Sequence, residues 1–402
     1  MRKILYWGPT PDELDGGAVV ADYLWRKYYE MFPLDELYAV PKNVEELNPQ
    51  RLPFVTFLKG DKHGLYREGG KLAGMAEHMT RHNIPLLVAF HIAESIGPHV
   101  FPIHEVGGVS ILYQTIHWAN DQVFTCKELP HINWFVTPTD YAKEVLCRVG
   151  KIPTKRVSVI PHGVDVDKFY PHNGMLRNEF GIKDDQPVIL YCGRLDLWKG
   201  IHNVIPSIRP LVQDYNAVFI IRGGVRQLEK SREMDYLFTT LANKYKRNVI
   251  YIPQWMPPEY MEELMASCDI YLSNSGHEGF NVPLVESMAC GRPVLTTDLA
   301  NHREIVGGTR NELHLLTPTE QVGIVNETQP VKVASAQLIY GALRQLLDNP
   351  EEREVCGMQG REKVLQQYDL RKVCSDWHKL FYTLIPDDYD LHAVMSQRML
   401  NQ

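Results

Sequence analysis

The stretch Cys268–Thr296, CDIYLSNSGHEGFNVPLVESMACGRPVLT, decides the fold. Its first five residues predict a buried strand, and a glycine-flanked turn that carries Glu278 follows. Val282–Cys290 predicts a short helix with Glu286 inside it, and a second strand begins at Pro293. Strand, turn, helix and strand in this order are half of a doubly wound α/β domain. Both carboxylates then lie at the end of that domain where ligands bind.

Length and composition predict an ordinary globular protein with more than one domain. The chain has 402 residues, which favours two or three domains. Its apolar fraction of 44% and its charged fraction of 23% are typical of globular proteins. The net charge of -7, without long charged runs, argues against a nucleic-acid partner. No run approaches the roughly 20 apolar residues of a membrane span, so we expect no stable membrane insertion.

The N-terminus and the cysteines indicate a cytoplasmic protein. The apolar run Ile4–Trp7 directly after Met1–Lys3 is too short for a signal peptide and predicts a first strand. Seven cysteines are scattered along the chain without a Cys-x-x-Cys pair. This usage is typical of a reducing compartment and does not predict a structural zinc site. We therefore expect a cytoplasmic location.

Short β-rich runs alternate with amphipathic stretches, which predicts parallel sheets covered by helices. The predicted strands of the first half are Lys3–Trp7, Glu36–Val40, Leu86–Phe90, Ser110–Gln114, Trp134–Thr137 and a run that begins at Val157. The predicted strands of the second half are Val188–Tyr191, Val218–Ile221, Val249–Ile252, Ile270–Ser273, Val294–Thr297 and Gly323–Val325. The predicted helices include Ala18–Met31, Val331–Leu347 and one that begins after Asp369. We expect an α/β fold with two Rossmann-like domains that face each other across a cleft.

A linker-like segment at Tyr170–Gly174 divides the chain. We expect a first domain at residues 1–168 and a second at residues 169–369. The helix after the second domain carries an apolar stripe over Leu370–Leu384. So much apolar surface on a terminal helix must dock elsewhere on the chain.

Two cations follow the first strand of the second domain. Arg194 comes directly after that strand, and Lys199 stands just before the next helix. Both would project at the carboxyl end of the sheet, where open α/β sheets bind ligands. Arginine grips phosphate oxygens with two nitrogen atoms and lysine adds a compact charge, so the pair suits a diphosphate. The alternative is a pair of ordinary surface cations on a loop.

The two glutamates of the opening stretch suit a sugar. Glu278 lies in the turn before the helix and Glu286 about one turn into it, so both can face one pocket. A carboxylate that accepts hydrogen bonds from neighbouring hydroxyls is a usual way to hold a ribose or a hexose. Pro283 near the first turn and the free amides of the helix would add an anion site. Alternatively, Glu278 only complements the helix dipole and Glu286 is a solvated helix residue.

Further motifs in the first half are weaker. Gly16 and Gly17 precede a helix, where glycines let the backbone approach a phosphate, although a plain tight turn explains them too. His117 follows a strand and is a candidate for a hydrogen bond to a sugar or acceptor hydroxyl, as is His91, but a histidine there is more often structural. Asp165–Asp167 spells the metal signature Asp-x-Asp. Its place in the turn that leaves the first domain predicts a connector instead.

Together these residues resemble the retaining glycosyltransferases of family 4, which have the GT-B fold. The matches in chain order are Gly16-Gly17 with the first-domain phosphate loop, His117 with the active-site histidine, Ile160–Asp165 with the Ile-Pro-Asn-Gly-Val-Asp connector, Gly193–Gly200 with the diphosphate clamp, and Glu278–Glu286 with the Glu-x(7)-Glu motif. Each fragment is short, but five of them in the family's order are specific. The resemblance covers nearly the whole chain.

The resemblance implies a division of labour between the domains. Residues 169–369 would bind a nucleotide-sugar donor, and residues 1–168 would bind an acceptor that carries a hydroxyl. The C-terminal helix, residues 370–402, would pack back onto the first domain. The base of the donor stays open between uridine, guanosine and adenosine, and the acceptor is not identified. The basic stretch Lys59–Arg67 is a candidate for acceptor contact or a solvated loop.

The resemblance also implies a role for each motif residue. Glu278 would contact the transferred sugar, and Glu286 would hold the ribose hydroxyls. Arg194 and Lys199 would neutralise the leaving diphosphate in place of a metal ion, so neither a metal nor a cofactor is expected. The backbone contacts to the sugar or to the phosphates would come from Gly16, Gly17, Phe280, Asn281 and Val282, and His117 would be the active-site histidine of the first domain.

The implied reaction is a hexosyl transfer with retention of configuration. Loss of the nucleoside diphosphate builds negative charge where Arg194, Lys199 and the helix amides are placed. Retention through a carboxylate nucleophile would need a second carboxyl about 5–5.5 Å away. Because Glu286 is assigned to the ribose, we favour attack on the same face, with the leaving phosphate accepting the proton.

The chain departs from the family pattern at two places, and other functions share its architecture. Asn281 stands where the family often has glycine, so donor preference does not transfer. His162 replaces the asparagine of the connector. A sugar-nucleotide epimerase, a phosphorylase, and a non-catalytic partner that binds a nucleotide sugar are the alternatives.

Overall fold

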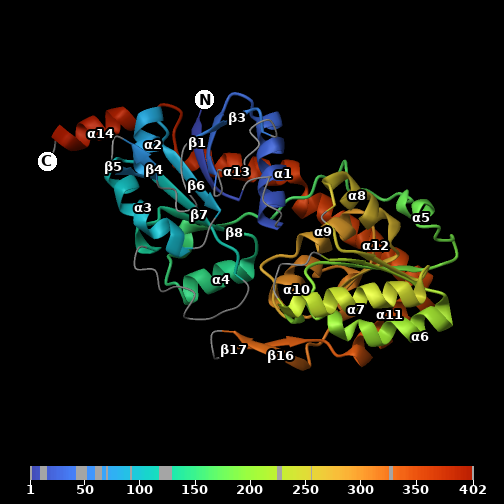
Figure 1. Ribbon diagram of the computed structural model, residues 1–402. Coiled ribbons are helices and arrows are strands. Elements are labelled where there is room, and N and C mark those ends of the chain that lie inside the picture. The colour runs from blue at the N-terminus through green and yellow to red at the C-terminus, as the bar shows by residue number, and fades with distance from the viewer. Residues whose placement is uncertain are drawn as a thin grey trace. The chain divides into compact units, whose positions relative to one another are not determined.

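The chain forms two compact units, one of residues 1–163 with 370–402 and the other of residues 164–369. In the first unit a parallel sheet is covered by helices on both faces, and the second unit has a sheet of the same kind (Figure 1). This confirms the predicted pair of Rossmann-like domains. The computed structural model describes residues 2–9, 16–41, 52–58, 66–68, 71–90, 93–116, 129–223, 229–254, 256–325 and 329–400.

The sheet of the first unit has seven parallel strands in the order β3-β2-β1-β6-β7-β8-β9. Their bounds are β1 Lys3–Gly8, β2 Glu36–Pro41, β3 Val55–Phe57, β6 Leu86–Phe90, β7 Val109–Tyr113, β8 Trp134–Thr137 and β9 Val157–Val159. The five strands predicted here with bounds are present, with ends that differ by one residue at most. A small antiparallel hairpin, β4 (Tyr66–Glu68) with β5 (Lys71–Ala73), was not predicted.

Helices α1 (Gly16–Met31) and α13 (Leu370–Leu384) cover one face of this sheet. The Trp377 ring of α13 is buried 5.8 Å from the rings of Phe90 and Tyr113, at the ends of β6 and β7. Phe381 is buried 5.7 Å from Tyr28 of α1. The apolar stripe predicted on the terminal helix therefore docks on the first unit. Because side chains alternate along a strand, Leu87 and other neighbours face the opposite side.

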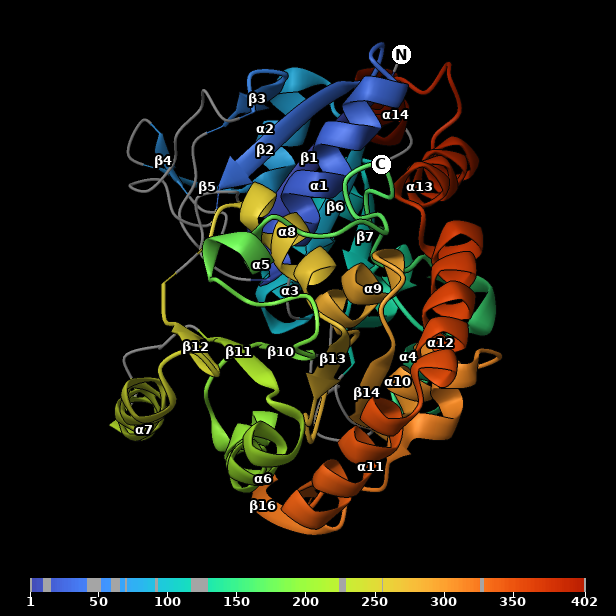
Figure 2. The same cartoon turned by 90° about the vertical axis from the view of Figure 1, so that its right-hand side faces the viewer.

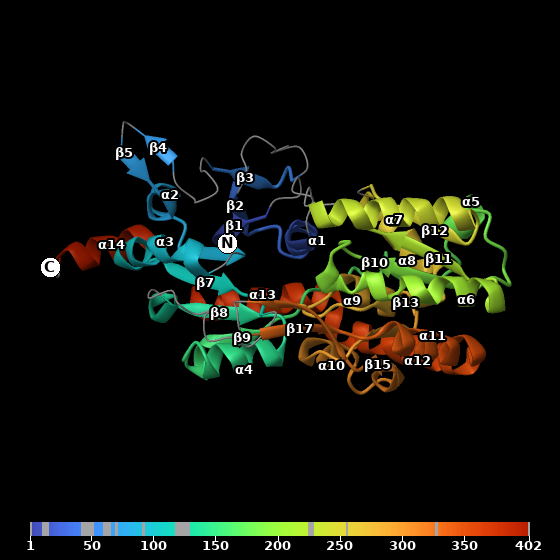
Figure 3. The ribbon, with the colours of Figure 1, turned by 60° about the horizontal axis from the view of Figure 1, so that its bottom comes forward.

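On that opposite side lie α2 (Met75–His82), α3 (Ala93–Glu105) and α14 (Leu391–Leu400), and α4 (Asp140–Arg148) packs near β8 and β9. Residues 370–402, predicted as one helix, thus contain two. Pro386 follows α13 and cannot continue it, because proline lacks the N–H that a helix interior needs. Arg398 of α14 donates to the carbonyl of His104 at the end of α3, and Figure 3 shows α14 next to α3.

The sheet of the second unit has six parallel strands in the order β12-β11-β10-β13-β14-β15. Figure 2 shows the strands from β12 to β14 side by side. Their bounds are β10 Val188–Cys192, β11 Val218–Arg222, β12 Val249–Ile252, β13 Ile270–Ser273, β14 Val294–Thr297 and β15 Leu315–Leu316. The predicted strands of this sheet are all present, and β15 was missed.

Two predictions beyond this sheet need correction, one in the sheet that a strand joins and one in the start of a helix. The strand predicted at Gly323–Val325 belongs to an antiparallel hairpin, β16 (Glu320–Val325) with β17 (Gln329–Val333), instead of the parallel series. The helix predicted from Val331 starts only at Ala336, as α11 (Ala336–Asp348), where Ser335 Oγ accepts from the Leu338 amide at 3.3 Å. Val331 and Val333 are buried while Lys332 is exposed, which is the alternation of a strand.

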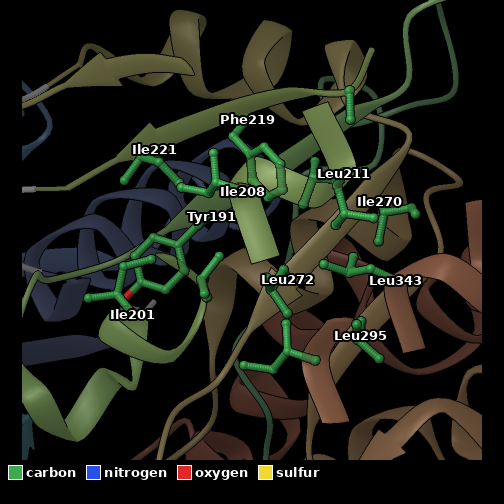
Figure 4. Packing of buried hydrophobic residues seen from close by; sticks show 14 of the residues in the cluster. Tyr191, Ile201, Ile208, Leu211, Phe219, Ile221, Ile270, Leu272, Leu295 and Leu343 are labelled. Atoms are coloured by element: carbon green, nitrogen blue, oxygen red, sulfur yellow. The ribbon is translucent and has the colours of Figure 1, made fainter. Parts of the chain in front are cut away.

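Helices cover both faces of the second sheet (Figure 1). One face carries α6 (Ile205–Tyr215), α7 (Glu229–Tyr245) and α11, and the other carries α8 (Pro258–Ser267), α9 (Val282–Ala289) and α12 (Pro350–Lys363). Figure 4 shows Ile208 and Leu211 of α6 packed beside Phe219 of β11 in the buried core. The remaining helical elements of this unit include α5 (Leu176–Glu179), α10 (Ala300–Val306) and a π-helical turn at Val364–Tyr368. Within the described part of the chain, no helix combines the length and the apolar character that crossing a membrane requires.

Candidate functional site

The two predicted cations of the second unit lie in a tight turn after β10. Asp196 caps the 3₁₀ turn Leu197–Lys199, because its Oδ1 accepts from the Lys199 amide at 3.0 Å. Its Oδ2 lies 3.2 Å from Nε of Arg194. The Arg194 side chain is 45% exposed, so this ion pair contributes little to stability. The Arg194 guanidinium is therefore accessible to a ligand at the carboxyl end of the sheet.

Lys199 and Glu278, predicted from two separate motifs, contact each other. Nζ of Lys199 donates to Oε1 of Glu278, and Oγ of Ser275 donates to the same oxygen at 2.8 Å. The two charged side chains are only 16% and 12% exposed. Burial would raise the pKa of Glu278, but the charge of Lys199 outweighs it and holds the pKa at about 2. Glu278 is therefore ionised in a site that largely excludes water.

Asn281 begins α9 in a backbone conformation that glycine favours, with a φ of 90°. Its Oδ1 accepts from the Leu284 amide at 3.3 Å, and its Nδ2 donates to Ser273 Oγ at 3.1 Å. The asparagine found in place of the family's glycine thus supplies a helix cap. Because this cap occupies the Leu284 amide and Pro283 has none, α9 offers an anion fewer free amides than the sequence predicted.

His302 of α10 forms a hydrogen bond with the Asn281 side chain. It was not predicted from the sequence. It is fully buried, and its Nδ1 lies 2.9 Å from the carbonyl oxygen of Thr297, which can only accept. Burial lowers the pKa of His302, so the ring is neutral, with its proton on Nδ1. Its Nε2 then accepts from Asn281 Nδ2 at 3.1 Å. A fixed tautomer therefore orients the asparagine.

Glu286 lies on α9 with only 4% of its surface exposed. Burial raises its pKa to about 8, and Arg222 at the end of β11 offsets part of that rise. The carboxyl group is thus mostly neutral at pH 7 in the free protein. It forms no hydrogen bond with any residue that the structure describes. A carboxyl with so little access to water gains from further hydrogen bonds, and vicinal hydroxyls of a ligand would supply them.

The other predicted residues of this unit lie nearby. Phe280 is 3% exposed, with its ring 5.7 Å from that of Tyr368, and Val282 is the first residue of α9. The structure thus brings the second-unit residues together where β10 and β13 end, and their roles stay predictions. Asp165 Oδ1 accepts from the Asp167 amide at 3.2 Å in a turn, as a connector would.

Of the residues predicted for the first unit, the structure describes Gly16, Gly17 and His162. Gly16 and Gly17 are the first residues of α1. His91, His117 and residues 59–65 of the basic stretch lie outside the described residues. His162 of the connector is half-buried, with Nδ1 3.0 Å from the Tyr113 hydroxyl, and desolvation lowers its pKa.

Within the described ranges, His314, Glu352 and Cys356 form the group whose ligand atoms lie close enough for a shared metal ion, within 4.8 Å. Glu352 already pairs with His314 at 2.9 Å and with Arg310 at 2.8 Å. These residues lie on α12 and on the 3₁₀ segment Arg310–His314. They belong to other elements than the turn that carries Arg194 and Lys199.

A family comparison covers the segment that contains this site. Residues 174–363 match the model of the family Glycosyl transferases group 1. Arg194, Lys199, Glu278 and Glu286 all fall within the matched residues.

Curated relatives are similar to the chain over part of its length. An uncharacterized glycosyltransferase of Methanocaldococcus jannaschii is 27% identical over 221 residues, 52% of this chain and 54% of its own. Alpha-maltose-1-phosphate synthase of Mycolicibacterium smegmatis is 20% identical over 314 residues, 77% of this chain and 76% of its own. Alpha-galactosylglucosyldiacylglycerol synthase of Streptococcus pneumoniae is 30% identical over 161 residues, 39% of this chain and 42% of its own. The chain thus spans about half the length of the first and the third relative.

Solved structures are similar over nearly the whole chain. HepE of Anabaena, in complex with UDP and glucose, has a TM-score of 0.72 at 15% identity and covers 95% of this chain and 100% of its own. Sucrose-phosphate synthase from Thermosynechococcus elongatus has a TM-score of 0.74 at 16% identity and covers 96% of this chain and 99% of its own. At these identities the likeness shows the fold alone, and it confirms the GT-B fold expected from the sequence.

Proposed function

We propose that this chain is a group 1 glycosyltransferase that moves a hexose from a nucleoside-diphosphate sugar to an acceptor hydroxyl. The family match over residues 174–363 and the GT-B fold support the class of reaction. The second unit would bind the donor and the first unit the acceptor. The six cysteines that the structure describes are free, which supports a reducing compartment such as the cytoplasm.

The observation that carries the proposal is the contact between Lys199 and Glu278, beside Arg194. It places an ionised carboxylate and two cations at the carboxyl end of a parallel sheet. The carboxylate suits sugar hydroxyls and the cations suit a diphosphate, so one donor molecule would engage all three. Without donor, Lys199 and Glu278 neutralise each other. On donor binding the ammonium would turn to the phosphates and the carboxylate to the sugar.

The chemistry that these residues would supply is electrostatic. As the bond to the sugar breaks, negative charge gathers on the diphosphate, and Arg194 and Lys199 stabilise it without a metal ion. Removal of one such group typically lowers kcat by about 10²–10³-fold. Gly16 and Gly17 would add backbone contacts to the donor phosphates, and His117 would contribute from the first unit, as the family resemblance implies.

The two glutamates differ in charge, which supports separate roles. Glu278 is ionised and already accepts hydrogen bonds from Lys199 and Ser275. Glu286 is mostly neutral and lacks a hydrogen-bond partner among the described residues. If the two glutamates acted as nucleophile and acid, both carboxyl groups would flank the same glycosidic bond of the transferred sugar. We therefore assign Glu278 to the sugar and Glu286 to the ribose, with retention through same-face attack, in which the leaving phosphate accepts the acceptor's proton.

The test is release of nucleoside diphosphate from UDP-, GDP- and ADP-sugars, with and without EDTA. UDP-sugars come first, because the HepE structure contains UDP. We expect turnover with one base, unchanged by EDTA, and a kcat about 10²–10³-fold lower in Lys199→Ala. Conversion of the sugar nucleotide without any acceptor would indicate an epimerase instead. Turnover lost with EDTA and restored by a divalent ion would contradict the metal-free clamp.

A further inference from the structure

We infer that Asn274 is a positioning residue for Lys199. The side-chain carboxamide of Asn274 holds the turn that carries Lys199 in the predicted diphosphate clamp. The inference rests on the proposed function, because the role of Lys199 does. Asn274 follows β13 directly and is fully buried. It lies within the stretch Cys268–Thr296, and no role was predicted for it from the sequence.

The carboxamide of Asn274 uses its full hydrogen-bonding capacity. Nδ2 donates to the carbonyl of Gly200 at 3.0 Å and to that of Ala334 at 3.1 Å. Oδ1 accepts from the Ala334 amide at 2.9 Å and from the Thr297 hydroxyl at 3.4 Å. A carboxamide has two N–H donors and two acceptor sites, so these four contacts saturate it. One side chain thus ties together three separate segments of the second unit.

The turn at Gly200 packs closely against Asn274. Gly200 adopts a φ of +61°, which suits glycine, and a Cβ there would lie 2.3 Å from the backbone oxygen of Asn274. The turn therefore rests directly on Asn274. Because Lys199 is the preceding residue, holding the Gly200 carbonyl restrains the short backbone segment from which the Lys199 side chain projects.

Asn274 is also the first residue of the loop that leads from β13 to Glu278. Its neighbour Ser275 donates to the Glu278 carboxylate at 2.8 Å. The bond from Asn274 to Gly200 and the bond from the Gly276 amide to the Trp198 carbonyl at 2.7 Å link this loop to the Lys199 turn, and together they set the separation of the two charged groups. Ala334, which bonds the Asn274 carboxamide, is also held by Asn203, whose Nδ2 donates to the Ala334 carbonyl at 2.9 Å. Asn274 is therefore itself fixed in place where it contacts the turn.

Substitution by aspartate isolates this role, since the two side chains have the same shape. Asn274→Asp removes both N–H donors and places a carboxylate against the carbonyls of Gly200 and Ala334. The turn must then move, and a misplacement of about 1 Å in a catalytic group lowers the rate by about 10²-fold. We expect kcat to fall by about that factor, and the affinity for the nucleoside diphosphate that the wild type binds to fall by at least about tenfold.

Asn311 provides a matched control in the same unit. It is 1% exposed, its Nδ2 donates to the Cys356 carbonyl at 2.8 Å and its Oδ1 accepts from the Val294 amide at 2.9 Å. Asn311→Asp should lower the melting temperature as Asn274→Asp does, because both put a carboxylate against a buried carbonyl. It should leave diphosphate affinity and kcat within about twofold of wild type. Equal kinetic effects of the two variants would overturn the inference.

A double-mutant cycle shows whether Asn274 acts through Lys199. Calorimetry with UDP, GDP and ADP, and turnover with the matching sugar nucleotide, are measured for Asn274→Asp, Lys199→Ala and the double variant. We expect Asn274→Asp to change neither quantity further once Lys199 is absent. Additive losses would overturn the inference and leave the proposed function intact. If the wild type binds none of the three diphosphates, the proposed function fails and the inference with it.

Should Asn274→Asp not fold, Gly200→Ala perturbs the same contact from the other side. Its added Cβ forces the turn away from Asn274 without changing any polar group. We expect the same fall in kcat and the same loss of effect in the Lys199→Ala background. A Gly200→Ala variant with wild-type kcat would overturn the inference.

Discussion

Removing Lys199 should destabilise the protein through Glu278, and the size of the effect can be worked out in two ways. Both side chains are largely buried, at 16% and 12% exposed, and deleting one partner of a buried ion pair typically costs about 3–5 kcal/mol. Independently, a Glu278 pKa lowered from 4.5 to about 2 corresponds to about 3 kcal/mol, since one pKa unit is worth about 1.4 kcal/mol. We expect Lys199→Ala to lower the free energy of unfolding by about 3 kcal/mol at pH 7.

The pH dependence of this loss identifies its cause. The folded pKa of Glu278 is depressed, so its stabilisation is fully present above the unfolded value of 4.5 and is lost as pH falls towards about 2. In Lys199→Ala, burial raises the pKa of Glu278, and protonation removes the unpaired charge. The difference in unfolding free energy between wild type and variant should therefore shrink below about pH 5.

Urea unfolding of wild type, Lys199→Ala, Glu278→Gln and the double variant between pH 3 and pH 8 measures this difference. Arg148→Ala is the control, because its ion pair with Glu144 is exposed on both sides, at 61% and 69%, and its loss should not change stability measurably. The reasoning is refuted if Lys199→Ala is as stable as wild type at pH 7. A loss of stability that does not change with pH would also refute it.

Three further predictions test separate parts of the structure. The affinity for the nucleoside diphosphate should rise about tenfold per pH unit up to about pH 8 and then level off. The reason is that Glu286, whose pKa is raised, must lose a proton to bind the ribose as a carboxylate. Calorimetry should show no such dependence on pH in Glu286→Gln. Trp377→Ala should cost about 3–5 kcal/mol of unfolding free energy in urea, and a loss under about 1 kcal/mol would mean that α13 does not anchor on the first sheet. Asn281→Gly should cost only a few tenths of a kcal/mol and Asn281→Ala about 1–2 kcal/mol, because alanine loses the cap and is strained at a φ of 90°; equal melting temperatures would contradict the cap.

The sequence predicted the sheets because buried parallel strands are short apolar runs with turn residues at their ends. Ile270–Ser273 and Trp134–Thr137 were predicted with the bounds that the structure has. The same reasoning failed at Val331, whose apolar run continues into α11 and hides the strand in front of it. Only the pairing with β16, which lies upstream in the chain, distinguishes the two.

The charged residues of the candidate site could be predicted because charges next to strand ends are conspicuous. The contact between Lys199 and Glu278 could not, since they are 79 positions apart in the sequence. Asn274 and His302 were missed because their roles depend on backbone carbonyls, which a sequence does not display. An asparagine directly after a predicted buried strand is the signal that could have singled out Asn274.

Binding of UDP, GDP and ADP in the presence of EDTA, compared between wild type and Lys199→Ala, tests the proposed donor site most directly. We predict that the wild type binds one of them without a metal ion and that Lys199→Ala binds it at least about tenfold more weakly, in line with the loss of one charged contact to the phosphates. Binding that requires a divalent ion, or that is unchanged in Lys199→Ala, would contradict a clamp made of side chains.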